Sequence, residues 1–163
     1  MFMKLTKILM VLPLSLLSIS AIAGMNDVNG STKCTTVDSI SKKKAIVKAC
    51  TYDGAVGGSM SYAISQLNFK LPNGNTYRTV NDATFDFDKN GNVQNLKESI
   101  SINGKAAEII NLHYKTFKKI SDKEIESRYE KKNPNFSDVL QCFKYIKKDA
   151  AFCVPYEFIS SMS

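Results

Sequence analysis

Apolar and polar side chains alternate along the stretch SYAISQLNFKL. Ala63, Leu67 and Phe69 fall on one side of an extended chain there, and Gln66 and Asn68 fall on the other. A period of two is typical of a strand with one buried face, because successive side chains of a strand point in opposite directions. The stretch therefore predicts a half-buried β-strand.

Asn-Gly pairs separate this stretch from others of the same kind, at 73–74, 90–91 and 103–104. Such a pair suits a two-residue type I′ turn, whose central residues both have positive φ. We expect that turn at Asn73-Gly74. Repeated Asn-Gly turns between alternating segments predict an antiparallel meander.

The stretch KCTTVDSISKKKAIVKACTY has a lysine-rich centre between two runs that contain β-branched residues. Turned as a hairpin about Lys42, it places Cys34 opposite Cys50 and Val37 opposite Val47. A cross-strand disulfide is compatible with that register.

A short helix over 41–50 is the alternative, since short apolar runs fit either element. The next stretch, DGAVGGSM at 53–60, is rich in glycine and matches no phosphate-binding pattern. It predicts a flexible loop.

Helical signals begin after the meander. Ser121, followed by Glu124 three residues later, has the form of a capping box. We expect a solvated helix over 121–132 that ends before Pro134.

A second helix is expected over 137–150, because four apolar side chains would share one face of it: Val139, Cys142, Phe143 and Ile146. Cys153 follows the end of this helix. A disulfide from Cys153 to Cys142 would fold the C-terminal segment back against it.

These elements define an α+β fold, with an antiparallel β-meander of about five to seven strands followed by two C-terminal helices and two local disulfides. We expect one globular domain over 24–163, β-rich over 33–118 and helical over 121–163.

Residues 1–23 have two lysines, an apolar middle and small residues before Gly24. This order is typical of a cleaved secretory signal peptide, and the apolar run is shorter than the roughly 20 residues of a membrane span. We expect an exported protein, periplasmic or extracellular, without stable membrane insertion after cleavage.

Basic residues exceed acidic ones in the remaining chain by 20 to 15, and only Arg78 and Arg128 are arginines. Lysines at this density usually form a solvated surface, and exported proteins rarely meet nucleic acid. The charge therefore fits an acidic protein or an anionic envelope component as partner, and no nucleic acid.

All four cysteines, Cys34, Cys50, Cys142 and Cys153, lie in the exported part. An oxidising compartment favours two disulfides, and three pairings are formally open. The local pairs follow from the hairpin and the second helix. Zinc is disfavoured because the chain has no C-x-x-C pair and one histidine.

A calcium loop is suggested by Asp86, Asp88, Asn90 and Gly91, which match its first, third, fifth and sixth positions. Lys97, however, stands at position twelve, where a bidentate acid is needed. We interpret the stretch as the turn of a hairpin, with Phe85 and Phe87 on one side, and expect no metal.

His113, the single histidine, would have to serve any hydrolytic triad, but no nucleophile motif such as G-x-S-x-G occurs. No cofactor is expected. Four residues are candidates for a binding face of tyrosines and basic side chains: Tyr62, Lys70, Tyr77 and Arg78.

The sequence thus favours an exported, non-enzymatic binding protein, such as an inhibitor or immunity protein that acts on another envelope or secreted protein. The alternative is an envelope hydrolase or small-ligand carrier with a cavity near His113.

Overall fold

The computed structural model describes residues 24–59 and 61–161. The elements in chain order are β1 (Gly24–Ser39), β2 (Lys44–Gly58), β3 (Tyr62–Lys70), β4 (Thr76–Phe87), β5 (Val93–Ile102), β6 (Lys105–His113), β7 (Lys119–Ile120), α2 (Asp122–Tyr129), β8 (Val139–Tyr145), β9 (Ala151–Pro155) and α3 (Tyr156–Ser160). The expected signal peptide lies outside the described residues.

All nine strands of this part of the chain belong to one sheet in the order β5-β4-β3-β2-β1-β9-β8-β6-β7, with every pairing antiparallel. A further pairing joins β5 to β6, so the pairings among eight strands close into a ring. The protein is therefore mostly antiparallel β-sheet, with two short helices in its C-terminal part and two disulfides.

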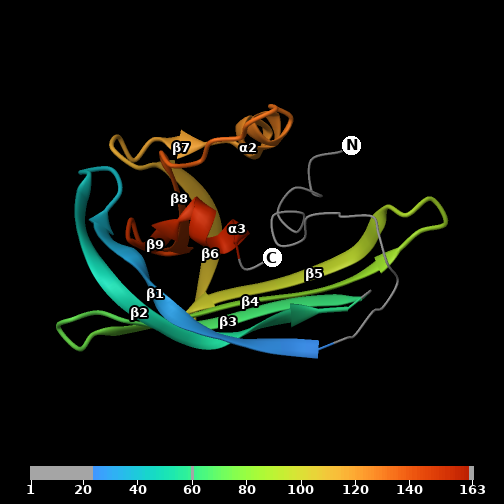
Figure 1. Ribbon diagram of the computed structural model, residues 1–163, viewed down its shortest axis with the longest axis horizontal. Coiled ribbons are helices and arrows are strands. Elements are labelled where there is room, and N and C mark those ends of the chain that lie inside the picture. Colours follow the sequence, from blue (N-terminus) through green and yellow to red (C-terminus); the bar gives the residue numbers. More distant parts are fainter. Residues whose placement is uncertain (1–23, 60, 162–163) are drawn as a thin grey trace.

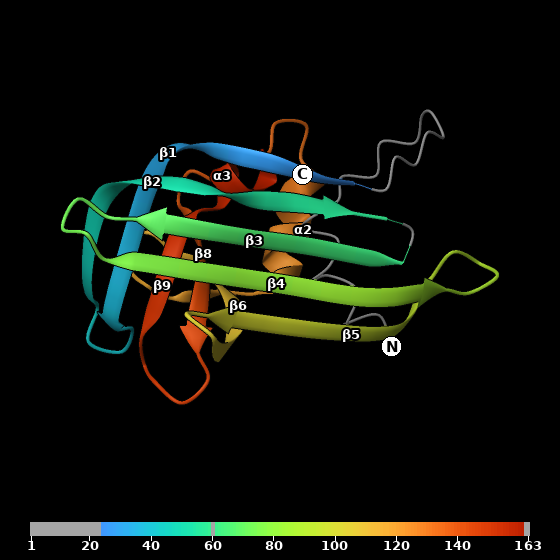
Figure 2. The same cartoon turned by 90° about the horizontal axis from the view of Figure 1, so that it is seen from below.

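The strands form two layers that share the long hairpin of β1 and β2. Strands β1 to β5 run side by side and form a broad first layer. Strands β6, β8 and β9 form a second layer, which runs across one face of the first (Figure 2). Helices α2 and α3 lie on that same side (Figure 1). No other described element covers the opposite face of β1–β5.

The main hydrophobic core lies between the two layers. Leu67 and Phe69 enter it from β3, while Phe143 and Phe152 enter it from β8 and β9. A smaller cluster around Ile125 packs α2 against the second layer. The predicted inward face of β3 is therefore confirmed.

Helix α2 confirms the predicted capping signal, because the side chain of Ser121 accepts a hydrogen bond from the backbone N–H of Glu124 at 3.2 Å. The helix ends at Tyr129, before Pro134 and slightly earlier than expected.

The helix predicted over 137–150 is wrong. Residues Val139–Tyr145 form strand β8, and the second short helix is instead α3, further along the chain. Five successive residues from Val139 are buried, because β8 packs against other structure on both faces. A strand buried on both sides lacks alternation, so its sequence resembles that of a helix.

The nine strands within 24–59 and 61–161 also exceed the expected five to seven. The stretch 53–58 of the glycine-rich segment belongs to β2 and not to a flexible loop. The alternative helix over 41–50 is likewise excluded, since β2 begins at Lys44.

Both disulfides have the predicted local pairing, Cys34–Cys50 and Cys142–Cys153. The predicted register of the first hairpin is wrong by two residues, because Cys34 is opposite Lys48. A register shift after Val37 and a turn with Lys43 at φ 54° move the centre of the hairpin toward the N-terminus. The first disulfide therefore joins diagonal neighbours.

Of the three Asn-Gly turns, Asn103-Gly104 has the two-residue form, with φ of 50° and 70°. Asn73 does not have positive φ. The chain there closes through a bond from the Gly74 N–H to the Leu71 carbonyl and a second bond from the Leu71 N–H to the Asn75 carbonyl. This wider loop, with glycine in the left-handed region, corrects the type I′ prediction at Asn73-Gly74.

The stretch that resembles a calcium loop is a hairpin turn of the same wide form. The Asp88 carboxylate accepts hydrogen bonds from the backbone N–H groups of Asn90 and Asn92, each at 2.8 Å. The Asn92 side chain, foremost among the donors, lowers the pKa of Asp88. Asp86 accepts a bond from the Asn95 amide at 3.1 Å.

The two phenylalanines beside this turn differ in burial, since Phe85 is buried and Phe87 is exposed. The two rings nevertheless lie on one side of β4, as predicted, with 5.4 Å between their centroids in an edge-to-face arrangement. The register shift between Thr84 and Asp86 places the extra residue on β5 and leaves the alternation of β4 intact. Among the described residues no helix is long and apolar enough to cross a membrane. The two disulfides are consistent with export.

Candidate functional site: the outer face of the first layer

The face of β1–β5 that points away from the second layer carries polar side chains in cross-strand rows. One row runs Asn29, Asp53, Asn68, Arg78, from β1 to β4. Directly opposite residues of antiparallel strands point to the same side of a sheet, so these four side chains share the outer face. All four are exposed.

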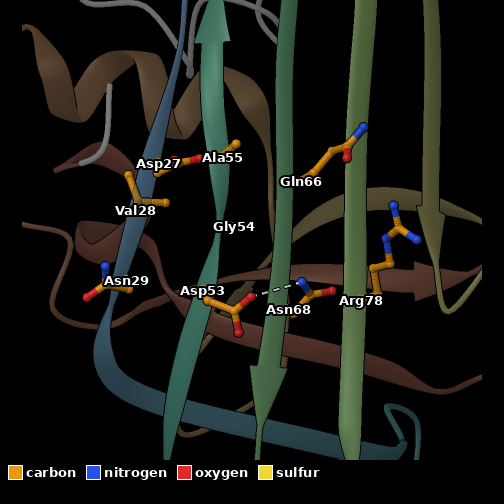
Figure 3. Close-up of a pocket in the computed structure, with 9 residues that line it drawn as sticks. All are labelled: Asp27, Val28, Asn29, Asp53, Gly54, Ala55, Gln66, Asn68 and Arg78. Carbon is orange, nitrogen blue, oxygen red and sulfur yellow. Dashed lines mark hydrogen bonds between the residues drawn. The ribbon is translucent and has the colours of Figure 1, made fainter.

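A neighbouring row runs Asp27, Ala55, Gln66 and then Val80. Apart from Val80, the residues of the two rows line a shallow open depression of about 390 Å³ (Figure 3). Its walls are carboxylates, amides and one guanidinium. Such groups recognise polar or charged ligand atoms through directed hydrogen bonds.

The floor of the depression is low because β2 contributes small residues, Gly54 and Ala55. Gly54 also lets the strands approach closely, since a Cβ atom built on it would lie 2.0 Å from the carbonyl oxygen of Gln66. The glycine-rich stretch is thus a structural requirement of this sheet.

Charges are divided across the depression. Asp27 and Asp53 lie on β1 and β2, and Arg78 lies on β4. Strands are spaced by about 4.8 Å, so Asp53 and Arg78 are separated by roughly 10 Å across β3. Within the described chain, none of these three side chains forms an ion pair.

Hydrogen bonds hold three of the lining residues in place. The Asn68 amide donates to the Asp53 carboxylate at 3.2 Å, as drawn in Figure 3. The backbone of Arg78 is bonded in both directions to Asn103, with its N–H donating to the Asn103 side chain at 2.7 Å and its carbonyl accepting from the Asn103 N–H at 2.8 Å. The β5–β6 turn therefore positions the strand segment that carries the guanidinium.

The structure brings three of the four predicted binding residues to this face. Arg78 lines the depression, while Lys70 and Tyr62 share the outward side of β3 with Asn68. Tyr77 lies on the opposite side, paired with Phe69 and stacked on Phe152 at 4.5 Å between ring centroids. The predicted combination of Tyr62 and Tyr77 on one face is therefore not formed.

Sequence reasoning missed the acidic side of the depression. Asp27 and Asn29 lie in the polar N-terminal half of β1, and Asp53 lies in the glycine-rich stretch, neither of which was expected to be a strand. Gln66 and Asn68 were placed on the correct polar side of β3, which was the one available signal.

His113 belongs to a different cluster, on the second layer. Its Nε2 atom lies 3.6 Å from the Asp138 carboxylate, and its Nδ1 accepts a hydrogen bond from the Lys115 N–H at 3.2 Å. The Nδ1 lone pair is thus occupied by a backbone N–H group, while 3.6 Å is too long for a hydrogen bond from Nε2.

Arg128 completes this cluster. Its guanidinium donates to both oxygens of Asp138 and to Glu124 at 3.0 Å. The hydrogen bonds from Arg128 lower the pKa of Asp138, and those to Asp138 raise the pKa of Arg128. The cluster joins α2 to the start of β8.

The described residues contain no group of three or more His, Cys, Asp or Glu side chains that could hold a metal ion. Comparisons with protein-family models, curated proteins and solved structures found no match to this chain. Its function is therefore inferred from its own residues.

Proposed function

We propose that the protein is an exported binding protein without enzymatic activity, whose outer β1–β4 face receives another envelope or secreted protein. The observation that carries this proposal is the charged, amide-lined depression on a layer face that no other described element covers. An inhibitor or immunity protein is the form of binding protein that we favour.

The charges of the depression suggest the partner's complementary chemistry. A basic side chain of the partner would meet Asp27 and Asp53, and an acidic one would meet Arg78. Because Arg pairs with carboxylates in a bidentate manner, Arg78 is the expected centre of binding energy. The alternative of a hydrolase or carrier at His113 has weaker support, since the Nδ1 atom of that histidine already accepts a hydrogen bond from the Lys115 N–H.

Site-specific photocrosslinking tests the proposal. A photoreactive residue is placed at Gln66 in the depression, or at the exposed Lys131 beyond α2 as a matched control, and the chain is exported in its own host. We expect one discrete protein adduct from Gln66 and none from Lys131. Arg78→Glu should reduce the adduct about tenfold or more, as loss of an interface hot spot does. Equal labelling from both positions, or no adduct, would contradict the proposal.

A further inference from the structure

Two turns that are distant in the sequence lie side by side at the end of the β1–β2 hairpin. The backbone N–H of Ile40 in the first turn donates to the carbonyl of Asp149 in the β8–β9 turn at 2.9 Å. The Asp149 carboxylate accepts from the Ser39 hydroxyl at 2.7 Å and from the Ser41 hydroxyl at 2.6 Å. Asp149 is therefore a clamp between the two turns.

Hydrogen bonding favours the charged form of the Asp149 carboxylate that makes the clamp. Hydrogen bonds from Ser41 and then Ser39 lower the pKa of Asp149, so the carboxylate stays charged below the usual range of an aspartate. The backbone N–H of Ser41 adds a further bond to the same oxygen at 3.0 Å.

Lysines surround the clamped turns, and all of them are exposed: Lys42, Lys43 and Lys44 on the first turn, and Lys147 and Lys148 on the second. The nearby acids are already engaged, since Asp149 holds the turns together and Asp38 pairs with Lys44 at 3.4 Å. In the described part of the chain no acid pairs with the other four ammonium groups.

An exposed apolar side chain accompanies these charges. Ile146 begins the second turn and is 58% exposed, more than any other large hydrophobic residue in the described chain. A soluble polyanion has no apolar surface on which this side chain could be buried, whereas the interfacial region of a membrane has one.

We propose that the two clamped turns form a second, separate surface that docks on an anionic membrane. Lysine ammonium groups would lie at the level of the lipid phosphates, with Ile146 inserted between headgroups. This peripheral contact involves no membrane-spanning segment. It would hold the protein at the envelope surface while the depression of the first layer faces its partner.

A substitution of Asp149 provides the sharpest test, because two explanations of the lysines predict opposite changes in binding to anionic vesicles. If the lysines act only through net charge, Asp149→Ala makes the protein more positive and strengthens binding to anionic vesicles. If the clamp presents the two turns together, the same substitution weakens binding, since the turns lose the side-chain bonds of Ser39 and Ser41 that fix their relative position and keep the backbone bond from Ile40.

The experiment measures binding of the exported, disulfide-bonded protein to vesicles of phosphatidylcholine with phosphatidylglycerol, and to vesicles of phosphatidylcholine alone. We expect binding to the mixed vesicles only. Lys147→Ser/Lys148→Ser should weaken it by roughly 10- to 30-fold. Lys131→Ser/Lys132→Ser, which removes an exposed pair of equal charge beyond α2, should change it less than about threefold.

Two further variants complete the test. Ile146→Ser should weaken vesicle binding several-fold and leave binding to soluble polyphosphate unchanged, and Asp149→Ala should weaken vesicle binding. Equal effects of the two lysine pairs, or tighter binding by Asp149→Ala, would overturn the docking surface. Polyphosphate binding as tight as vesicle binding, with Ile146→Ser without effect, would reassign it to a soluble polyanion. Neither result bears on the photocrosslinking test, which concerns the opposite end of the hairpin.

Discussion

Gly54 shows how one residue shapes both the sheet and the candidate site. The strand β2 passes β3 so closely that a Cβ atom at Gly54 would meet backbone atoms on two residues, with Gln66 O at 2.0 Å and Leu67 Cα at 2.9 Å. Backbone atoms of a paired strand cannot move aside as a flexible side chain can. The same close approach keeps the floor of the depression low.

Gly54→Ala should therefore destabilise the protein by more than about 3 kcal/mol, the upper range for an overpacked site. The control is Gly91→Ala, where nothing lies within 4 Å of the added Cβ and the cost comes only from a φ of +79°. That control should cost about 1–2 kcal/mol. Urea unfolding of both variants makes the comparison. Equal losses of unfolding free energy in the two variants would show that β2 and β3 can move apart at no cost in stability.

At the scale of secondary-structure elements, Asp138 attaches α2 to β8 through its hydrogen bonds with Arg128. The arginine is largely buried, with 15% of its side chain exposed, while the Asp138 side chain is 40% exposed. Because solvent screens the charge of the carboxylate, the ion pair contributes only about 1 kcal/mol to the free energy of unfolding.

We expect Asp138→Asn to lower the melting temperature at neutral pH, with a difference from the unchanged protein that disappears in acid. The Arg128 hydrogen bonds lower the pKa of Asp138 in the folded state, so its stabilisation is fully present above the unfolded value of 3.8 and is lost as the pH falls through the folded value. Glu124→Gln removes the more exposed partner of Arg128 and should have a smaller effect. A pH-independent difference would exclude the ionic explanation.

Several elements were predictable because one local rule determined each of them. Strand β3 has one buried face and therefore alternates, and Ser121 caps α2 through a contact three residues away. Strand β8 was misread because burial on both faces removes the alternation that distinguishes a strand. The N-terminal half of β1 is polar and rich in glycine, so its pairing with β2 appears only in the folded chain.

The candidate site was less predictable than the elements. Arg78 was identified, but the depression depends on rows that cross four strands, and two of those strands were not recognised over the relevant residues. Tyr77 was assigned to the wrong side because the expected two-residue turn at Asn73-Gly74 is a wider loop. Cross-strand register is a long-range property that local patterns leave open.

At the scale of the whole molecule, the ring of strands makes the two layers interdependent. Two short strand pairings join the layers: Thr35, Thr36 and Val37 of β1 pair with Cys153, Phe152 and Ala151 of β9, and the end of β5 pairs with the start of β6. Strand β9 faces the main core with Phe152 and Val154 and a second cluster with Ala151 and Cys153. Its attachment to β8 therefore supports both clusters at once.

Removal of the Cys142–Cys153 disulfide tests this interdependence. Cys142 and Cys153 are directly opposite in β8 and β9, with 0% exposure and a Cα–Cα distance of 4.0 Å. Closing a loop of 11 residues is worth roughly 3 kcal/mol in the chain-entropy model, so Cys142→Ala/Cys153→Ala should lower stability by about that amount. Because both clusters depend on β9, we expect unfolding by urea to remain a single transition, with the same midpoint by circular dichroism and tyrosine fluorescence. Two separate transitions would mean that the first layer, which carries the candidate site, keeps its structure without the second.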